Sequence, residues 1–428
     1  MVFNKSERVP KMKTKVLRWG RIVLPQEEKK PSVWDNVVEI RVDEEQVSTM
    51  FAIKKPVKSI GGGAAAAAAG GEKKAESQKP VRVLPDKRFN AISILRTQLP
   101  QGNQLSEIIM KFDRTRLQPS AVANLYKSLL TEEEIASIQE VMGPGVTLDK
   151  AEQFGMMVAE IPCIAQRLHC WTFMNDFDER VEDIGPALTI VQKACKELRE
   201  SGVLRGFLGV VLTLGNILNA GNKNLGQADG FNLETFKAIT DMHDTANKTT
   251  MLDVALGYCK GSLIEEIPHI GEATGVDLKY VQGCFGKLNT EFQSVSKDYE
   301  LLASQLPPDD PTVTFVGKFV KEKTEEVSNL KCEVQDTAKM FTETVEWFTM
   351  DPSKSSTYTT DSFFGIFKGL ADAFTRKAKA AAGAAGRRDR GATYGKKLGA
   401  GDDPMADIIA KIKAGQAKKM NLSNVGQN

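Results

Sequence analysis

The feature that most constrains this chain is the helical spacing of its apolar residues between residues 86 and 380. Val, Ile and Leu recur there at intervals of three and four, and the strict alternation typical of strands is hard to find. Residues 312–349 carry a stripe whose spacing is close to a heptad, which predicts a helix packed lengthwise against its neighbours. Unbroken, that helix would run about 55 Å. We therefore predict an all-α fold that is elongated rather than compact.

Shifts in composition divide the chain into segments. A flexible linker of about 30 residues has a root-mean-square span of roughly 30 Å and can stretch further, so it isolates the segment before it. We predict an amphiphilic N-terminal arm at 1–53, a flexible Gly/Ala/Pro linker at 54–85, a helical body at 86–380, a disordered basic linker at 381–402 and an amphipathic helix at 403–428.

Bulk charge and composition exclude several classes of protein. The chain has 57 basic and 55 acidic residues, so no whole-molecule attraction to nucleic acid or an anionic membrane is expected. No run approaches the roughly 18 apolar residues of a membrane span, and the start lacks the apolar segment of a signal peptide. Six cysteines occur without a Cys-x-x-Cys pair, which indicates buried free thiols rather than a metal or disulfide framework. We expect a soluble, cytoplasmic protein.

The most informative stretch is 215–252, which reads GNILNAGNKNLGQADGFNLETFKAITDMHDTANKTTML. A buried helix is predicted to end near Asn216–Asn219, where asparagine side chains can bond to neighbouring backbone groups. Gly215 and Gly221 would allow close approach of backbone or a positive φ.

The loop that follows is polar, and Phe231 and Leu233 are expected to re-enter the core. A glycine-rich loop can also bind phosphate. That function needs a preceding strand and a Gly-Lys-Ser/Thr or G-x-G-x-x-G pattern, and the stretch has neither. Phosphate binding is therefore not predicted.

The same stretch resembles the signature of the formin homology 2 domain, Gly-Asn-x-Met/Leu-Asn-x-Gly followed by a polar loop, Gly-Phe-x-Leu and Asp-x-Lys. Other segments agree in the right order: KMKTKVLRWGRI with SVWDNV, LPDKRFNAISILRTQL, and TDSFFGIFKGLADAFTRKAKA. The resemblance covers about residues 11–380. It implies an actin-assembly domain of the formin family, with lasso arm, linker, knob, coiled-coil and post regions in a ring-like homodimer.

In this family the arm is a lasso that encircles the post of a second subunit, and two exchanges close a ring. The resemblance implies that Trp19 and Trp34 anchor the arm. Burying one tryptophan removes about 200 Å² from water, worth about 5 kcal/mol before entropy losses. Alternatively, both tryptophans pack on their own subunit. The receiving surface would be the small and amide residues of the loop: Gly215, Asn216, Asn219 and Gly221.

Actin contact in the family rests on two positions, and the first matches Ile94. The family's isoleucine inserts from the knob into a cleft of actin. Ile92 and Leu95 share the segment, and an isoleucine in a helix is usually buried, so the residues alone do not separate Ile94 from the core.

The second position is a lysine of the post, and His243 stands there in the text TDMHD. A neutral imidazole supplies no fixed charge, whereas a lysine pairs with an acidic partner throughout the physiological range. We expect a weaker or pH-sensitive post contact, for which Lys237 and Lys248 could compensate.

The C-terminal segment PMADIIAKIKAGQAKK resembles the diaphanous autoregulatory motif. It also resembles the actin-monomer-binding helix of WASP-homology type, although Ala417 stands where that motif has leucine. Either helix would dock in a partner's groove. The alternative is a dispensable tail. The expected anchors share one face: Met405, Ile408, Ile409 and Ile412.

The resemblance implies a dimer that nucleates actin filaments and binds the barbed end processively in the cytoskeleton, with no cofactor, no metal and no catalytic residue. A family member usually carries a proline-rich segment that recruits profilin-bound actin, but the longest proline run here is Pro307–Pro308. Delivery by profilin in cis is therefore not expected.

The sequence leaves two alternative functions to consider. An enzyme would need a nucleophile and base brought together, and His169 beside Cys170 does not suffice, because adjacent helix positions point apart. The second alternative is a helical dimeric scaffold that has lost strong actin contact.

Overall fold

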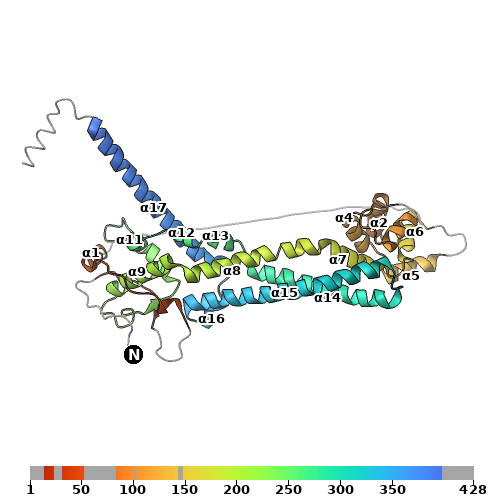
Figure 1. Ribbon diagram of the computed structural model, residues 1–428, viewed down its shortest axis with the longest axis horizontal. Helices are drawn as coiled ribbons and strands as arrows, with labels where there is room; N and C mark the ends of the chain where they lie inside the picture. Colours follow the sequence, from red (N-terminus) through yellow and green to blue (C-terminus); the bar gives the residue numbers. More distant parts are fainter. Residues whose placement is uncertain (1–13, 24–30, 53–82, 101–102, 143–147, 398–428) are drawn as a thin grey trace, which may run out of the picture. The chain divides into compact units, whose positions relative to one another are not determined.

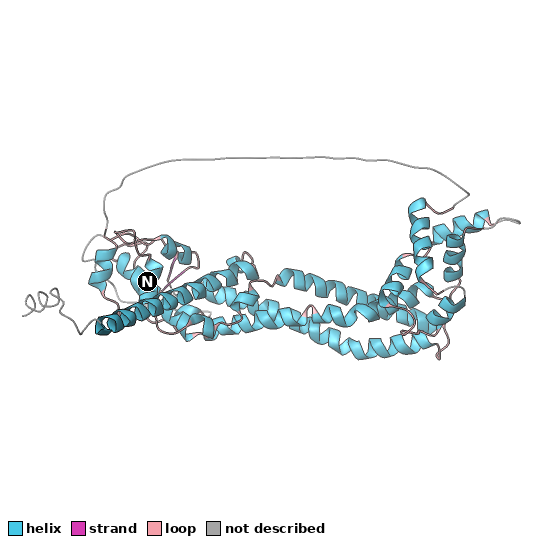
Figure 2. Cartoon of the chain, turned by 90° about the horizontal axis from the view of Figure 1, so that it is seen from above, coloured by secondary structure: helices cyan, strands magenta, loops and turns pink. Residues whose placement is uncertain are grey.

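The computed structural model describes residues 14–23, 31–52, 83–100, 103–142 and 148–397. The chain divides into two compact units, Met1–Gly369 and Leu370–Asn428. Helices account for almost all of the regular structure (Figure 2). This confirms the all-α prediction.

Four helices of the described first unit pack lengthwise against one another. α14 packs along α7, and α15 packs along both α8 and α14 (Figure 1). α15 has 39 residues, which at 1.5 Å per residue is about 58 Å, close to the predicted length. Its apolar stripe is buried, as Val316, Val334 and Phe348 show. The four are α7 (Ile164–Glu182), α8 (Gly185–Glu200), α14 (Leu278–Gln305) and α15 (Pro311–Thr349).

Five shorter helices of the described chain lie between the arm and α7, and we call them the knob. The chain enters the knob through Val83 and Leu84, whose amides both donate to Glu152 Oε1, at 2.9 and 3.1 Å. Val83 and Leu84 lie at the C-terminal end of the segment 54–85 that the sequence predicts as a linker. The helices are α2 (Asp86–Gln98), α3 (Asn103–Met110), α4 (Pro119–Lys127), α5 (Glu132–Val141) and α6 (Lys150–Ala159).

We call the elements from α9 to α13 the post. Every residue of α9 from Phe207 to Leu218 is buried, and α9 ends at the predicted position with Asn219 as its C-cap. The elements are α9 (Gly202–Leu218), β2 (Gly230–Phe231), α10 (Thr235–Asp241), α11 (Met251–Tyr258), α12 (Leu263–Glu266) and α13 (Ile270–Ala273).

Among the described residues, no single helix is long and apolar enough to cross a membrane. One pair of segments, Ile164–Glu200 with Gly202–Leu218, passes that test by length and composition alone, and it is bent by 53°.

The arm contributes β1 (Arg21–Ile22), the 3₁₀ helix η1 (Val33–Asp35) and α1 (Glu44–Met50). β1 pairs antiparallel with β2 of the post, with Arg21 opposite Phe231. α1 packs against α9. The sequence pattern did not predict this strand pair, because two residues are too few to display an alternation.

After α16 (Pro352–Ser355), the first turns of α17 (Thr360–Lys397) carry three buried phenylalanines, Phe363, Phe364 and Phe367. Phe363 and Phe367 pack against Phe348 of α15, with ring centroids 5.9 and 4.8 Å apart.

The second unit begins at Leu370 within α17. The helix continues to Lys397, through part of the stretch predicted as a disordered linker. Alanine has the highest helix propensity, and the alanine-rich text there supports the helix. The anchors predicted for the terminal helix, Met405, Ile408, Ile409 and Ile412, lie outside the described residues.

Candidate functional site

Two tryptophans of the arm meet one phenylalanine of the post. Trp19 stacks nearly parallel to Phe231, with ring centroids 5.8 Å apart and planes 10° apart. Trp34 packs on the same ring at a tilt, with centroids 4.6 Å apart. Trp19 and Trp34 expose only 6% and 2% of their surface. Aromatic pairs of this kind add about 0.5–1.5 kcal/mol beyond the area they bury, so Phe231 is the centre of the arm contact.

Glycines of the post make room for the indoles. A Cβ added at Gly215 would overlap the ring of Trp19, and one added at Gly230 would overlap the ring of Trp34. Gly221 has φ +74°, in the left-handed region that glycine tolerates best. Of the two roles expected for these glycines, Gly215 therefore provides the close approach and Gly221 the positive φ.

The two predicted asparagines are buried. Asn219 binds backbone of the arm, and Asn216 binds backbone of the post loop that receives the arm. Asn219 Oδ1 accepts from the Leu17 amide at 3.0 Å, and Asn219 Nδ2 donates to the Leu17 carbonyl at 2.9 Å. Asn216 does the same for Ala228 in the loop, at 2.7 and 2.9 Å. Asn219 thus holds the arm directly, while Asn216 shapes the loop that receives it.

These contacts form within one chain. The arm packs on the post of the same chain through the β1–β2 pair and the Trp19–Phe231 stack. The contacts themselves involve only arm and post residues, so they do not depend on which subunit supplies the arm.

The ends of the arm are joined to each other. Thr14 and Ala52 form an antiparallel bridge, and the Lys15 amide donates to the Phe51 carbonyl at 2.6 Å. Phe51 is fully buried. The described arm is therefore closed into a loop.

Ile94 lies on α2 with its side chain in solvent. It exposes 61% of its surface, whereas Ile92 and Leu95 on the same helix expose 1% and 5%. Leaving one isoleucine exposed gains nothing for folding, because its burial would add about 1.5–3 kcal/mol. Ile94 is therefore a surface residue, a distinction the sequence did not make.

An ion pair fixes α2 to α5 near Ile94. Arg88 donates to both carboxylate oxygens of Glu134, at 2.9 and 2.8 Å, and to the Leu129 carbonyl at 2.8 Å. The hydrogen bond from Arg88 is the largest of the effects that lower the pKa of Glu134. A bidentate pair of this kind holds its helices in a defined geometry.

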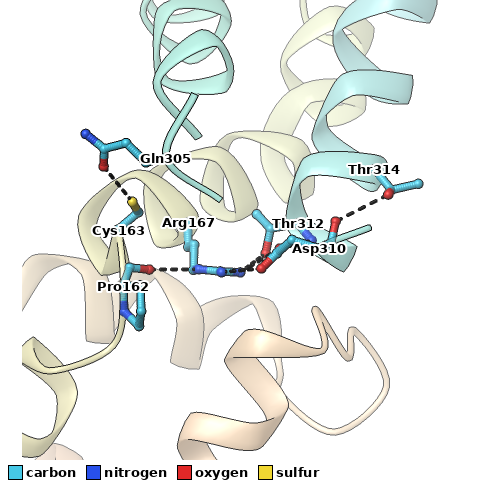
Figure 3. Close-up of polar contacts among 7 residues, drawn as sticks. All are labelled: Pro162, Cys163, Arg167, Gln305, Asp310, Thr312 and Thr314. Atoms are coloured by element: carbon cyan, nitrogen blue, oxygen red, sulfur yellow. Dashed lines mark hydrogen bonds and ion pairs between the residues drawn. The ribbon is translucent and has the colours of Figure 1, made fainter. Parts of the chain in front are cut away.

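A second ion pair joins the long helices where they meet the knob (Figure 3). Arg167 near the start of α7 binds Asp310, the N-cap of α15, at 3.0 and 2.5 Å, and donates to the Pro162 carbonyl at 2.9 Å. It also donates to Thr312. Burial raises the pKa of Asp310, but the hydrogen bond and charge of Arg167 outweigh it, and the pKa lies below its ordinary value.

His243 lies in the loop between α10 and α11, half-buried, with its Nδ1 3.0 Å from the Asp241 carbonyl oxygen. It forms an isolated β-bridge with Thr250. The structure therefore places Ile94 on the knob and His243 on the post, and the two residues belong to different parts of the first unit.

The cysteines are free. Cys170 and Cys195 are buried as predicted, but Cys332 is exposed and three others are half-buried. Burial raises the pKa of Cys170 to about 12, so its thiol is not ionised for nucleophilic attack. Its neighbour His169 instead contacts Asp298, with Nδ1 2.5 Å from the carboxylate.

Two open pockets of similar volume lie among the described residues. One of about 440 Å³ is lined by Arg180, Asp183, Ile184, Tyr280, Val281, Cys284 and Lys287, and one of about 420 Å³ is lined by Pro31, Ser32, Arg199, Glu343, Glu346, Trp347 and Met350. Neither lining contains a histidine that could serve as the base of a Cys–His pair. Within the described ranges, no group of three or more His, Cys, Asp or Glu side chains is placed to hold a metal ion.

Sequence reasoning missed several arm–post residues. Phe231 is buried in the core as predicted, but the sequence did not indicate that both tryptophans pack on its ring. Asn232 exchanges hydrogen bonds with Gly20, at 3.3 and 3.1 Å, and extends the strand pair. Lys15 was not singled out. The only available signal was that these residues fall inside the motif segments.

Comparison with known proteins gives the same family. The family profile of the Formin Homology 2 Domain matches residues 4–375. Formin-C of Dictyostelium discoideum is 30% identical over 362 residues, which make up 81% of this chain and 31% of that protein. Formin-G of the same organism is 28% identical over 430 residues, 96% of this chain and 39% of the relative.

Protein diaphanous of Drosophila melanogaster is 26% identical over 277 residues, 63% of this chain and 25% of that protein. The chain thus spans only a quarter to two fifths of the length of these relatives. The described fold is almost wholly helical, and its N-terminal arm packs on the post. The chain belongs to the formin homology 2 family.

Proposed function

We propose that this protein nucleates actin filaments and binds their barbed end processively as a homodimer in the cytoplasmic actin cytoskeleton. Membership of the formin homology 2 family over almost the whole chain supports an actin-assembly role. The observation that carries the proposal is Ile94, an isoleucine 61% exposed on a helix whose position is fixed by Arg88 and Glu134. An exposed apolar side chain on a rigid element is suited to insertion in a partner's cleft.

The dimer in this proposal is a ring made by exchange of the arms. Domain exchange replaces each contact within a chain by the same contact between chains, so it costs little when a long linker joins the exchanged part. The aromatic contact of Trp19 and Trp34 with Phe231 would serve equally well in the exchanged form. Each subunit would then bridge two actin subunits through its knob and its post.

Processive binding follows because the two halves of the ring bind the filament end separately. One half holds the filament end while the other releases and steps to a newly added actin subunit. This needs no cofactor, because the free energy comes from binding each new actin subunit. Ile94 supplies the knob grip, and the loop that carries His243 supplies the post grip.

A pyrene-actin assembly assay, with seeded elongation from barbed ends, tests the proposal. Purified protein should speed assembly and alter barbed-end growth at micromolar concentration, and Ile94→Ala should abolish most of both effects. Ile264→Ala is a matched control, because Ile264 is an isoleucine 38% exposed on α12 of the post. If the wild-type protein neither nucleates nor caps, the dimeric-scaffold alternative replaces the proposal.

A further inference from the structure

The loop that carries His243 is a short closed turn between two helices. The Asp244 amide donates to the Thr249 carbonyl at 2.9 Å, and the Met251 amide donates to the Met242 carbonyl at 2.8 Å. The Lys248 amide donates to Asp244 Oδ1 at 2.9 Å, which is the largest of the effects that lower the pKa of Asp244. These bonds shape the turn.

The arm contributes three further bonds to that loop. Lys15 Nζ donates to the carbonyl oxygens of His243 and Asp244, at 2.7 and 3.1 Å. The Thr245 amide donates to the Met50 carbonyl at 2.7 Å. A charged donor shared between two carbonyls makes hydrogen bonds stronger than neutral ones, so Lys15 fixes the backbone on which the His243 side chain is mounted.

These contacts come from both ends of the arm. Lys15 belongs to its first described segment and Met50 to its last, and the two segments are paired through the Lys15 amide and the Phe51 carbonyl. Closure of the arm and restraint of the His243 loop therefore belong to one hydrogen-bonded unit. Opening the arm would remove all three outside bonds from the loop at once.

We infer that the docked arm positions the His243 loop for partner binding, with Lys15 as the positioning residue. The inference rests on the proposed function, in which this loop is the post's contact with actin. The inference links closure of the dimer by the arm to the strength with which the post binds actin. A subunit whose post has lost its arm would keep the fold of the post but would present a loosened loop.

A substitution of Lys15 can test the inference because other residues also hold the arm on the post. Trp19 and Trp34 hold the arm on Phe231, a contact in which Lys15 takes no part. Lys15→Met should therefore leave the arm docked while removing the two bonds from Nζ. Lys15→Arg keeps a charged donor and should restore most of the effect. Arg18→Met removes the same charge from an exposed arm residue and serves as the control.

Hydrogen exchange measured by mass spectrometry on the full chain, beside barbed-end affinity, decides the inference. In Lys15→Met, exchange in the peptide covering 242–250 should rise by about tenfold, while exchange around Leu17 and the sedimentation of the protein stay unchanged. Barbed-end affinity should fall by about fivefold or more, as expected for coupled sites. Lys15→Arg should stay near wild type in both measurements, and Arg18→Met should equal wild type.

Unchanged loop exchange in Lys15→Met overturns the inference, as does an equal rise in Arg18→Met. A loosened loop with wild-type affinity overturns the coupling to the partner. If the wild-type protein does not bind barbed ends, the proposed function fails, and loop exchange still decides whether the arm orders the loop.

Discussion

Trp19 of the arm lies flat against Phe231 of the post, with its indole Nε1 donating to the Leu225 carbonyl at 2.9 Å. The indole of Trp19 is thus held both by stacking on Phe231 and by the hydrogen bond from its only polar atom, Nε1. Replacing Trp19 by alanine should weaken arm docking by about 3–5 kcal/mol, since a large buried side chain and its packing are lost. Limited proteolysis of the arm and sedimentation equilibrium would measure this loss. Val38→Ala, at an arm residue that is 74% exposed, should change neither.

The fit between Gly215 and Trp19 predicts a coupled pair of substitutions. Gly215→Ala should weaken arm docking by about 1–3 kcal/mol, because the new methyl group meets the indole ring. In a Trp19→Ala background the ring is gone, so Gly215→Ala should cost much less. A double-mutant cycle on arm protection from proteolysis measures this difference. Additive effects would contradict the contact.

The Arg167–Asp310 pair predicts a dependence of stability on pH. The pKa of Asp310 is lowered in the folded protein, so its contribution is fully present above its unfolded pKa of about 3.9 and is lost as pH falls through the folded value. The difference in stability between wild type and Asp310→Asn should be constant above about pH 5 and shrink below about pH 4. Urea unfolding at a series of pH values measures it, with the exposed neighbour Asp309→Asn as control. A difference that persists at pH 3 would contradict the role of the carboxylate.

His243 stands where the family pattern has lysine. Restoring lysine adds a fixed positive charge at the surface, worth about 0.2–1 kcal/mol against an acidic partner. His243→Lys should therefore tighten barbed-end binding about 1.4-fold to fivefold at pH 7.5. Unchanged affinity at pH 7.5 would show that His243 makes no such contact.

The cysteines should differ widely in reactivity. Cys332 is exposed, whereas burial raises the pKa of Cys170 to about 12 and that of Cys195 to about 11. At pH 8 a maleimide should label Cys332 first, and Cys170 and Cys195 only after unfolding. Peptide mapping after timed labelling measures the order. Early labelling of Cys170 would mean that the core around α7 opens readily.

The sequence pattern predicted the helices well because their burial repeats over many turns. The 39 residues of α15 offer more than ten turns in which an apolar stripe can be recognised. The end of α9 was also predictable, since Asn219 and Gly221 are typical of a helix end. Contacts between segments far apart in sequence could not be predicted, as the pairing of Arg21 with Phe231 illustrates.

The sequence also could not predict which individual residues of a helix are buried. Ile92, Ile94 and Leu95 lie within four positions of one helix, and only three-dimensional packing decides which of them faces solvent. Lys15 was equally hidden, because its partners are main-chain carbonyl oxygens that every residue possesses. A side chain that acts on backbone leaves no complementary residue type to recognise in the sequence.

The joined ends of the arm bear on how long an exchanged dimer would last. If an exchanged arm encircled the partner's post, the loop closed between Thr14 and Ala52 would have to open before the two subunits could separate. The lifetime of such a dimer would then be set by the rate of opening a few backbone bonds, and it would hardly vary with protein concentration. Subunits once linked would keep the same partner through many rounds of dilution.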